Sequence, residues 1–522
     1  MILRNYFPQK NLDVYQKLVL SSLSLLLITL IVISNFHEIG SYGVETDFYG
    51  GYAPNVEKLL NGEPYHDEDH GPGYLFFLTI FYFIFGDIFI AGKFLTIVTS
   101  VLFAFFSFAT IKNLFDSKLA FYTTILLILV IFPYSILAST DMVFAFLIAL
   151  STFLLFRNGK LTNSNMIWGG LIAGYAVMTR LNAVILPAAL IFSIIFINPE
   201  GWSLKQKLKA SAILCAAVLV AASPWFVMNL IYYGKPFIFQ AHQTIGASFL
   251  GGGGSADATF AWGTEKEIIA SKYDSLLSLI LGNFATFVKF FLKNIIQYFK
   301  MLLMRLVQFP GYLLVVPGLV VLFSRVNKIQ LSYYIIPLFG FLIYCIVSFI
   351  PRFYIYIIVF FLLPIIYFIF ADFFSALDKK SAFRYKIISH AMLVIILLFS
   401  AQISFSEMKK HITTEPLHLL KIAPLLIQES QPHDKIIARK PHLGYFSKLE
   451  TIIIPNVDTV DQLLEYANEK GVRFVFYGIM EQKASPGLLI LQQPESLPEQ
   501  FELLYSQMNP EVYLYRIKHQ EN

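Results

Sequence analysis

Charged residues are scarce in this chain. Asp, Glu, Lys and Arg make up 14% of its 522 residues, whereas a soluble domain carries about a quarter. Hydrophobic residues make up 57%, and the mean hydropathy is +0.64. This shortage of charge excludes an ordinary soluble protein and predicts an integral membrane protein.

Cysteine is almost absent, and so is any concentration of positive charge. Cys215 and Cys345 lie inside apolar segments, where an isolated cysteine behaves as a small hydrophobic side chain. They provide no disulfide framework and no cysteine metal site. The net charge of +5 comes from short basic clusters between apolar runs rather than from a continuous patch, so we expect no nucleic-acid partner.

Apolar runs long enough to cross a bilayer are abundant, and they predict an α-helical polytopic protein. The basic clusters between the runs fall on one side of the resulting threading, and the positive-inside rule makes that side cytoplasmic. We expect the bacterial inner (plasma) membrane, a cytoplasmic N-terminus and two large outer loops, 35–87 and 231–308. The predicted spans, about eleven at roughly 20 residues each, lie near 18–34, 88–111, 119–137, 141–157, 166–179, 182–197, 210–230, 309–324, 332–349, 353–371 and 387–404.

Two other apolar stretches are predicted not to span. Residues 74–86 are too short and are typical of a juxtamembrane helix. Residues 276–307 place Lys289, Lys293 and Lys300 on one helix face, which favours an amphipathic helix on the outer surface of the membrane. Counting this stretch as a span would also move every later basic cluster to the outer side.

The composition changes after Phe405. Apolar runs shorten to strand length, and helical patterns at 417–429 and 459–470 alternate with them. We therefore divide the chain into a transmembrane domain, residues 1–405, and a small extracytoplasmic soluble α/β domain, residues 406–522. Strands are expected at 435–438, 451–454, 473–477, 488–491 and 512–515.

The first outer loop is rich in acids. It contains Glu45, Asp47 and Tyr49, and a carboxylate there could take the proton of an acceptor hydroxyl as that hydroxyl attacks carbon. Farther along come His66, the acids at 67–69 and His70. This second group fits either a solvated acidic loop or contacts to an acceptor or a divalent cation; no other cofactor is indicated.

Four further charges lie at the ends of predicted spans. Asp141 opens the fourth span, as a helix cap stabilised by the helix dipole or as a second acid facing the outer pocket. Arg180, Arg352 and Lys93 lie near outer helix ends. They could extend to the interface as snorkelling side chains, or they could bind a lipid phosphate, which arginine contacts through two N–H groups.

The position of these charges separates three classes of function. Acids that activate an acceptor, together with cations that hold a phosphate, indicate a transferase using a lipid-phosphate donor at the outer interface. A flippase or other transporter would more often place its charges at mid-membrane and show repeat symmetry. A non-catalytic envelope scaffold would need only a solvated loop. Both stay as alternatives.

Several motifs follow in order along residues 15–375. They are Glu45-Thr46-Asp47, Gly71-Pro72-Gly73-Tyr74, Ala91-Gly92-Lys93, Ser139-Thr140-Asp141, Met178-Thr179-Arg180 and Pro351-Arg352-Phe353-Tyr354. Together they resemble the GT-C glycosyltransferase fold, and within it glycosyltransferase family 39, the protein-mannosyltransferase and aminoarabinose-transferase branch.

The resemblance implies transfer of a sugar from a polyprenyl- or dolichyl-phosphate to a protein, lipid or glycan acceptor on the non-cytoplasmic face, with inversion at the anomeric carbon. It also implies that Asp47 is the acid of the first loop, that Asp141 is the acid of the fourth span, and that Arg180 meets the donor phosphate. The chain departs from the pattern at Phe48, where many relatives carry a second acid or an arginine, and at Gly71, where relatives often carry a charge.

We therefore expect a membrane glycosyltransferase, transferring a hexose or a pentose from a polyprenyl-phosphate donor. The expected catalytic residues are Asp47 and Asp141, and the expected phosphate-binding residues are Arg180, Arg352 and Lys93. Expected contacts to the acceptor or to a divalent cation come from Glu45, Tyr49, His66, Asp69 and His70.

Overall fold

The computed structural model describes residues 12–63, 70–236, 241–250, 269, 271–347, 349–370 and 379–518. The chain divides into two compact units. Unit 1 comprises residues 1–37, 66–239 and 285–413, and unit 2 comprises residues 38–65, 240–284 and 414–522. This division assigns residues 38–65, about half of the outer loop predicted at 35–87, to the same unit as the C-terminal residues.

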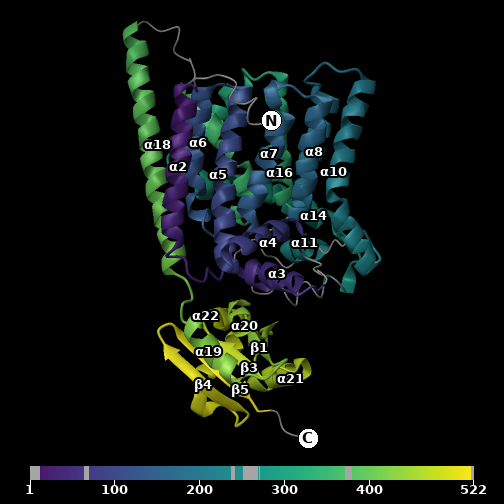
Figure 1. The fold of residues 1–522 in the computed structure, drawn as a ribbon, viewed down its shortest axis with the longest axis vertical. Helices are drawn as coiled ribbons and strands as arrows, with labels where there is room; N and C mark the ends of the chain where they lie inside the picture. The colour runs from purple at the N-terminus through teal and green to yellow at the C-terminus, as the bar shows by residue number, and fades with distance from the viewer. Residues whose placement is uncertain are drawn as a thin grey trace. The chain divides into compact units, whose positions relative to one another are not determined.

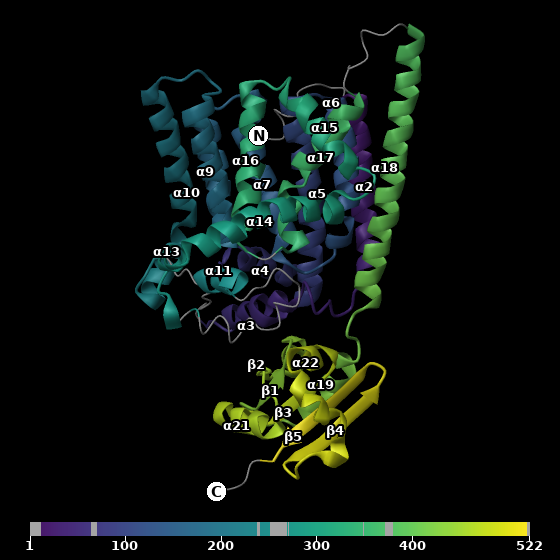
Figure 2. The same cartoon turned by 180° about the vertical axis from the view of Figure 1, so that it is seen from behind.

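Unit 1 is helical. Both views show its long helices lying side by side (Figure 1, Figure 2). Its helices are α2 (Val14–Ser34), α4 (Gly73–Phe85), α5 (Ile88–Leu114), α6 (Ser117–Ile131), α7 (Thr140–Leu155), α8 (Asn163–Thr179), α9 (Ile185–Phe192), α10 (Leu204–Tyr233), α14 (Phe284–Leu302), α15 (Tyr312–Phe323), α16 (Lys328–Tyr344), α17 (Val359–Phe370) and α18 (Lys379–Thr413).

The membrane prediction is confirmed, whereas the number of spans stays a prediction. Among the described residues, six helices are long and apolar enough to cross a bilayer: Val14–Ser34, Ile88–Leu114, Ser117–Tyr134, Thr140–Gly159, Leu204–Tyr233 and Lys386–Thr413. The count rises to eight if two bent helix pairs each form one span. Four other apolar helices have 10–17 residues, so they are shorter than a straight span of roughly 20 residues.

The stretch predicted to be amphipathic folds largely as α14. Lys289, Lys293 and Lys300 are all exposed, whereas Asn294 and Tyr298 are buried. The two buried side chains donate hydrogen bonds to backbone carbonyls at 345 and 347, over 2.9 and 2.8 Å. In Figure 2, α14 runs across the long helices rather than along them. The basic face is therefore real, and its placement on the membrane surface stays a prediction.

Small residues let α8 approach α10 closely. A Cβ atom added at Gly174 would lie 2.3 Å from the carbonyl oxygen of Val218, and one at Gly170 would lie 2.7 Å from the Cβ of Ala217. Glycines spaced four apart allow this kind of backbone contact between membrane helices. The contact holds α8, and with it Arg180 at its C-terminal end, against a neighbouring long helix.

Unit 2 contains a five-stranded sheet in the order β2-β1-β3-β5-β4. β1 is parallel to β2 and β3, and β5 is antiparallel to β3 and β4. The elements are β1 (Lys435–Ala438), β2 (Glu450–Ile453), β3 (Phe474–Tyr477), β4 (Phe501–Met508) and β5 (Glu511–Ile517), with helices α3 (Ala53–Leu60), α11 (Ala241–Leu250), α13 (Leu276–Gly282), α19 (Leu419–Glu429), α20 (His442–Ser447), α21 (Val460–Lys470) and α22 (Ile479–Ala484).

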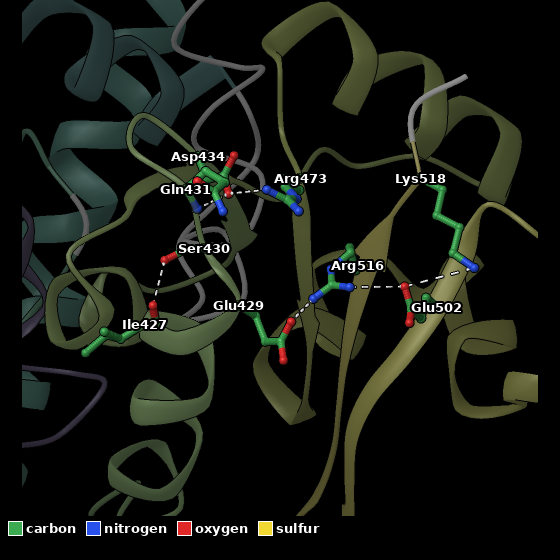
Figure 3. Close-up of polar contacts among 9 residues, drawn as sticks. All are labelled: Ile427, Glu429, Ser430, Gln431, Asp434, Arg473, Glu502, Arg516 and Lys518. Atoms are coloured by element: carbon green, nitrogen blue, oxygen red, sulfur yellow. Dashed lines mark hydrogen bonds and ion pairs between the residues drawn. The ribbon is translucent and has the colours of Figure 1, made fainter. Parts of the chain in front are cut away.

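Ion pairs connect this sheet to α19. Arg516 on β5 pairs with Glu429 at the end of α19, and with Glu502 on β4 over 3.3 Å (Figure 3). Arg473, just before β3, pairs with Asp434, just before β1, over 3.0 Å. Such partly exposed pairs contribute about 0–1 kcal/mol each, so they fix register more than they stabilise the sheet.

The strand predictions need two corrections. The apolar run at 488–491 is part of a 3-10 helix, Pro486–Gln492, in which Leu488 and Leu491 are buried while the two residues between them are exposed. This spacing of three suits a tight helix and not the alternation of a strand. The edge strand β4 was also not predicted, because Glu502, Ser506 and Gln507 interrupt its apolar residues.

Candidate active site

Asp141 is a buried carboxylate in the first turn of α7. The N-terminal cap of this helix is Ser139, whose Oγ accepts a hydrogen bond from the backbone N–H of Asp141 over 3.3 Å. Asp141 is 5% exposed. The N-terminal cap is therefore Ser139 and not Asp141, whereas Asp141 lies in the first turn, where the helix dipole favours its charge as expected. Its carboxylate is available to other partners.

The first partner of Asp141 is Arg180. Its Nη2 lies 2.6 Å from Oδ1 of Asp141, and its Nε donates to Oγ1 of Thr140 over 2.7 Å. Arg180 follows α8 directly and has an extended backbone. Because the helix ends there, the side chain can reach the start of α7 instead of following the axis of α8.

The second partner is Arg352, in the 3-10 helix Pro351–Ile357 before α17. Its Nη1 lies 3.7 Å from Oδ2 of Asp141, so two guanidinium groups share one carboxylate. The ring of Phe353 contacts both: its centre lies 5.0 Å from Cζ of Arg180 and 5.5 Å from Cζ of Arg352. Contacts of this length between a cation and an aromatic face are attractive and help to fix both side chains.

The side chains of the two arginines are more exposed than the side chain of Asp141 that they share. Arg180 and Arg352 keep 16% and 13% of their side-chain surface exposed, whereas Asp141 keeps 4%. The buried carboxylate thus contacts two arginine side chains that each keep part of their surface exposed. Cations preorganised in this way can stabilise an oxyanion or a phosphate without reorganising when charge develops.

Two glycines at and just before the start of α4, Gly73 and Gly71, pack against the segment that carries Arg180. A Cβ atom at Gly71 would lie 2.0 Å from the carbonyl oxygen of Met178, and one at Gly73 would lie 2.5 Å from Oγ1 of Thr179. The Oη of Tyr175 also donates to the carbonyl of Gly73 over 2.8 Å. This backbone contact explains why position 71 has no room for the charged side chain that relatives often carry there.

Lys93, expected to bind phosphate, has a different environment. It is buried on α5, and its ammonium group donates to the carbonyl oxygens of Ser34 over 2.9 Å and His37 over 2.6 Å. These carbonyls lie at and just beyond the C-terminal end of α2, where a cation is favoured by the helix dipole. The contacts account for the buried charge without a phosphate, so the phosphate role of Lys93 stays a prediction.

The candidates in the first part of the outer loop, Glu45, Asp47 and Tyr49, lie in unit 2. Glu45 is fully buried, and its carboxylate accepts hydrogen bonds from the N–H and the hydroxyl of Ser41, both over 2.9 Å. Tyr49 is buried in the short π-helix Phe48–Tyr52, whereas Asp47, just before that helix, is exposed. Glu45 is therefore a structural carboxylate of the loop, and Asp47 is the acid that solvent or a substrate can reach.

The predicted cation contacts are only partly described. His66 and Asp69 lie outside the described residues, while His70 is half-buried in the bend before α4. Within the described ranges, no group of three His, Cys, Asp or Glu side chains is arranged to hold a metal ion. A divalent cation in this loop stays a prediction.

The sequence analysis missed several side chains of the cluster around Asp141. Thr140 and Phe353 are neighbours of predicted residues, and adjacency was the signal that could have identified them. Asn182 was not predicted; its amide donates to Oη of Tyr344 over 2.6 Å, and the Tyr344 ring stacks on Phe353 at 5.8 Å. Nothing in the spacing of residues 182 and 344 indicates that contact.

Known proteins resemble this chain in two ways: a family model matches part of its sequence, and solved structures share its fold. Residues 69–227 match the family model of the dolichyl-phosphate-mannose-protein mannosyltransferases, a segment that includes Gly71, Asp141 and Arg180. No curated protein sequence matches the chain.

Solved structures match nearly the whole chain. ArnT from Cupriavidus metallidurans bound to undecaprenyl phosphate has a TM-score of 0.59 at 14% identity, covering 97% of this chain and 98% of that one. The Archaeoglobus fulgidus oligosaccharyltransferase tethered to an acceptor peptide has a TM-score of 0.55 at 12% identity, covering 95% and 74%. The archaeal oligosaccharyltransferase AglB from Archaeoglobus fulgidus, in complex with an inhibitory peptide and a dolichol-phosphate, also has a TM-score of 0.55 at 12% identity, covering 96% and 74%. The chain thus has the fold of the GT-C glycosyltransferases, like ArnT and the protein mannosyltransferases.

Proposed function

We propose that this protein is a membrane glycosyltransferase that moves a sugar from a polyprenyl-phosphate donor to an acceptor on the extracytoplasmic face. The observation that carries the proposal is the pair of partly exposed arginine side chains, Arg180 and Arg352, whose guanidinium groups both contact the buried carboxylate of Asp141. Arginine binds phosphate oxygens through two parallel N–H groups, and the lipid carrier leaves the reaction as a phosphate.

In the proposed reaction, an acceptor hydroxyl attacks the anomeric carbon of the sugar. A bond from the acceptor oxygen to that carbon forms, the bond from the carbon to the phosphate oxygen breaks, and polyprenyl phosphate departs with the electron pair. Asp47 takes the proton of the hydroxyl. This role rests on the resemblance of the Glu45-Thr46-Asp47 motif and on the exposure of the Asp47 side chain. Arg180 and Arg352 stabilise the charge that develops on the leaving phosphate.

Asp141 acts through the arginines in this proposal. Its two oxygens each face one guanidinium group, at 2.6 and 3.7 Å, which suits a residue that orients cations better than one that accepts a proton from a substrate. The expectation of a second acid at this position is therefore replaced by a positioning role.

The acceptor and the sugar are proposed only by class. ArnT was solved with undecaprenyl phosphate, and the archaeal oligosaccharyltransferase with dolichol-phosphate and peptides. We propose a carrier of that lipid class and a hydroxyl-bearing acceptor, a hexose or pentose as the transferred sugar, and a bacterial inner membrane with the C-terminal residues outside.

The experiment is a transfer assay in proteoliposomes with a radiolabelled polyprenyl-phosphate sugar. Asp47→Asn should remove turnover while the donor still binds, and Arg180→Ala should lower kcat/KM by about 100-fold, since it removes a charge-assisted contact to the leaving group. The control is Arg157→Ala, just beyond the opposite end of α7, which should leave the rate unchanged. Near-normal turnover in both Asp47→Asn and Arg180→Ala would refute the proposal.

The same vesicles separate the transferase from a flippase. A transferase consumes labelled donor on one side and releases polyprenyl phosphate, whereas a flippase moves intact donor to the other leaflet. Movement of intact donor without release of the phosphate would favour the transporter.

A further inference from the structure

The start of the first outer loop packs into the hydrophobic core of the C-terminal α/β domain. Ile39 is 1% exposed and belongs to a hydrophobic cluster formed otherwise by residues of 419–514. Next to it, the carboxylate of Glu415 accepts hydrogen bonds from the backbone N–H groups of Glu38 and Ile39, over 2.9 and 2.8 Å. The start of the loop is therefore an integral part of unit 2.

The point of attachment is the carboxyl edge of the parallel strands. β1 and β3 are followed directly by Arg439 and Gly478, whose backbone N–H groups both donate to the buried carboxylate of Glu481, over 2.7 and 3.0 Å. This edge is where open α/β sheets usually bind their ligands. Here the loop after β1 is fixed by Glu481, and it presents Lys440 and α20 to residues of the first loop.

Lys440 holds the residue that precedes Asp47. Its ammonium group donates to Oγ1 of Thr46 over 3.1 Å, and the same hydroxyl donates to the carbonyl oxygen of Tyr42 over 2.6 Å. The contact joins positions 394 residues apart in the sequence. It fixes Thr46, and so the backbone from which the Asp47 side chain projects.

α20 contacts the first loop both before and after Asp47. Nε2 of His442 donates to the carbonyl oxygen of Ser41 over 3.2 Å. The ring of Tyr49 is surrounded by three rings of α20: His442 at 4.8 Å, Tyr445 at 5.0 Å and Phe446 at 5.2 Å between ring centres. Aromatic contacts at this range are attractive and directional, so Tyr49 cannot shift without disturbing α20.

We infer that the C-terminal α/β domain positions Asp47, with Lys440 and His442 as positioning residues that fix the first loop before and after it. The inference rests on the proposed function, in which Asp47 is the proton acceptor. It gives the domain a role in the reaction itself, because a base displaced by about 1 Å can lose a factor of 100 in rate.

The test begins with Lys440→Met, which removes the ammonium group and keeps most of the side-chain length. We expect kcat to fall by about 10- to 100-fold, with the donor KM unchanged within about twofold, since the proposed phosphate-binding residues lie elsewhere in the chain. Lys440→Arg should restore most of the rate. The control is Lys421→Met, an exposed lysine of α19, which should leave kcat unchanged.

A second measurement reports on the loop without relying on activity. Amide hydrogen exchange of residues 41–49 should become faster in Lys440→Met, and in His442→Gln, which removes the ring packed against Tyr49, than in the wild type or in Lys421→Met.

The outcomes separate the inference from the proposed function. Full turnover in both Asp47→Asn and Arg180→Ala would overturn the proposed function. Full turnover in Asp47→Asn while Arg180→Ala is slow would overturn the role of Asp47 and, with it, the positioning inference. Unchanged kcat in Lys440→Met, while Asp47→Asn is inactive, would overturn the positioning inference and leave the proposed function intact. Slow, wild-type exchange of residues 41–49 in both Lys440→Met and His442→Gln would also overturn the inference.

Discussion

Asp141 and Arg180 form an ion pair of 2.6 Å between the start of α7 and the end of α8. The carboxylate is almost wholly buried, and the same carboxylate also meets Arg352. A buried charge that loses its partner costs about 3–5 kcal/mol. The pair should therefore contribute to the stability of unit 1 as well as orient Arg180 for the proposed phosphate contact.

Asp141→Ala should therefore lower the free energy of unfolding by about 3–5 kcal/mol, because it leaves two guanidinium groups without their shared carboxylate. Chemical denaturation in detergent measures the change. The control is Asp116→Ala, which removes the N-terminal cap of α6 and should cost only about 1 kcal/mol. A loss at Asp141 no larger than the loss at Asp116 would mean that the ion pair contributes little.

Lys93→Met separates a structural lysine from a phosphate-binding one. Its ammonium group donates to the carbonyl oxygens of Ser34 and His37, so the substitution should destabilise the protein by about 1–3 kcal/mol through unsatisfied carbonyls. The donor KM should stay within about twofold of the wild-type value. A rise of tenfold or more in that KM, measured in the transfer assay, would restore the phosphate role first expected for Lys93.

Gly71→Ala tests the close packing beside Arg180. The added methyl group would lie 2.0 Å from the carbonyl oxygen of Met178, so the two backbones must separate. We expect a loss of about 1–3 kcal/mol in stability together with a clear fall in kcat/KM, as the segment carrying Arg180 shifts. In the control, Gly311→Ala, an added Cβ atom meets neighbours only at 3.5 Å, so both quantities should stay near the wild type.

The stability of unit 2 should fall at mildly acidic pH because of His442. Burial lowers the pKa of His442 from 6.5 to about 4; Glu45 and the hydrogen bond to Ser41 act in the opposite direction, and Lys440 adds to the lowering. Above pH 6.5 the side chain is neutral whether the chain is folded or unfolded, so it makes no difference to stability. Between pH 6.5 and 4 only the unfolded chain takes up the proton, and folding loses up to about 3 kcal/mol.

Calorimetry of the full chain in detergent, from pH 7 to pH 4, measures this loss. His442→Gln keeps a donor for the carbonyl of Ser41 but cannot titrate, so it should flatten the pH dependence. Burial also lowers the pKa of the half-buried His418, to about 4, so some dependence should remain. His433→Asn, at an exposed position, is the control. An equally steep profile in His442→Gln would assign the effect to other groups.

Much of the molecule follows from its sequence alone. The shortage of charge and the long apolar runs determined a helical membrane protein, because a backbone in lipid must satisfy its own hydrogen bonds. The shift in composition after Phe405 determined the α/β domain, and the basic spacing in α14 determined its exposed face. The sequence alone singles out Asp141, Arg180 and Arg352. Charged side chains at helix ends in an apolar sequence are costly to bury and are usually paired or functional.

Tertiary structure decided which of these charges meet. Asp141 pairs with both arginines, and Lys93 donates to carbonyl oxygens at the end of α2. Both sets of contacts depend on where helices end and how they pack. No local pattern encodes a contact between residues 141 and 352. The attachment of Asp47's loop to α20 is likewise a contact across almost 400 positions. Sequence patterns specify periodicity and local charge, whereas long-range partners are selected by burial and shape once the chain has folded.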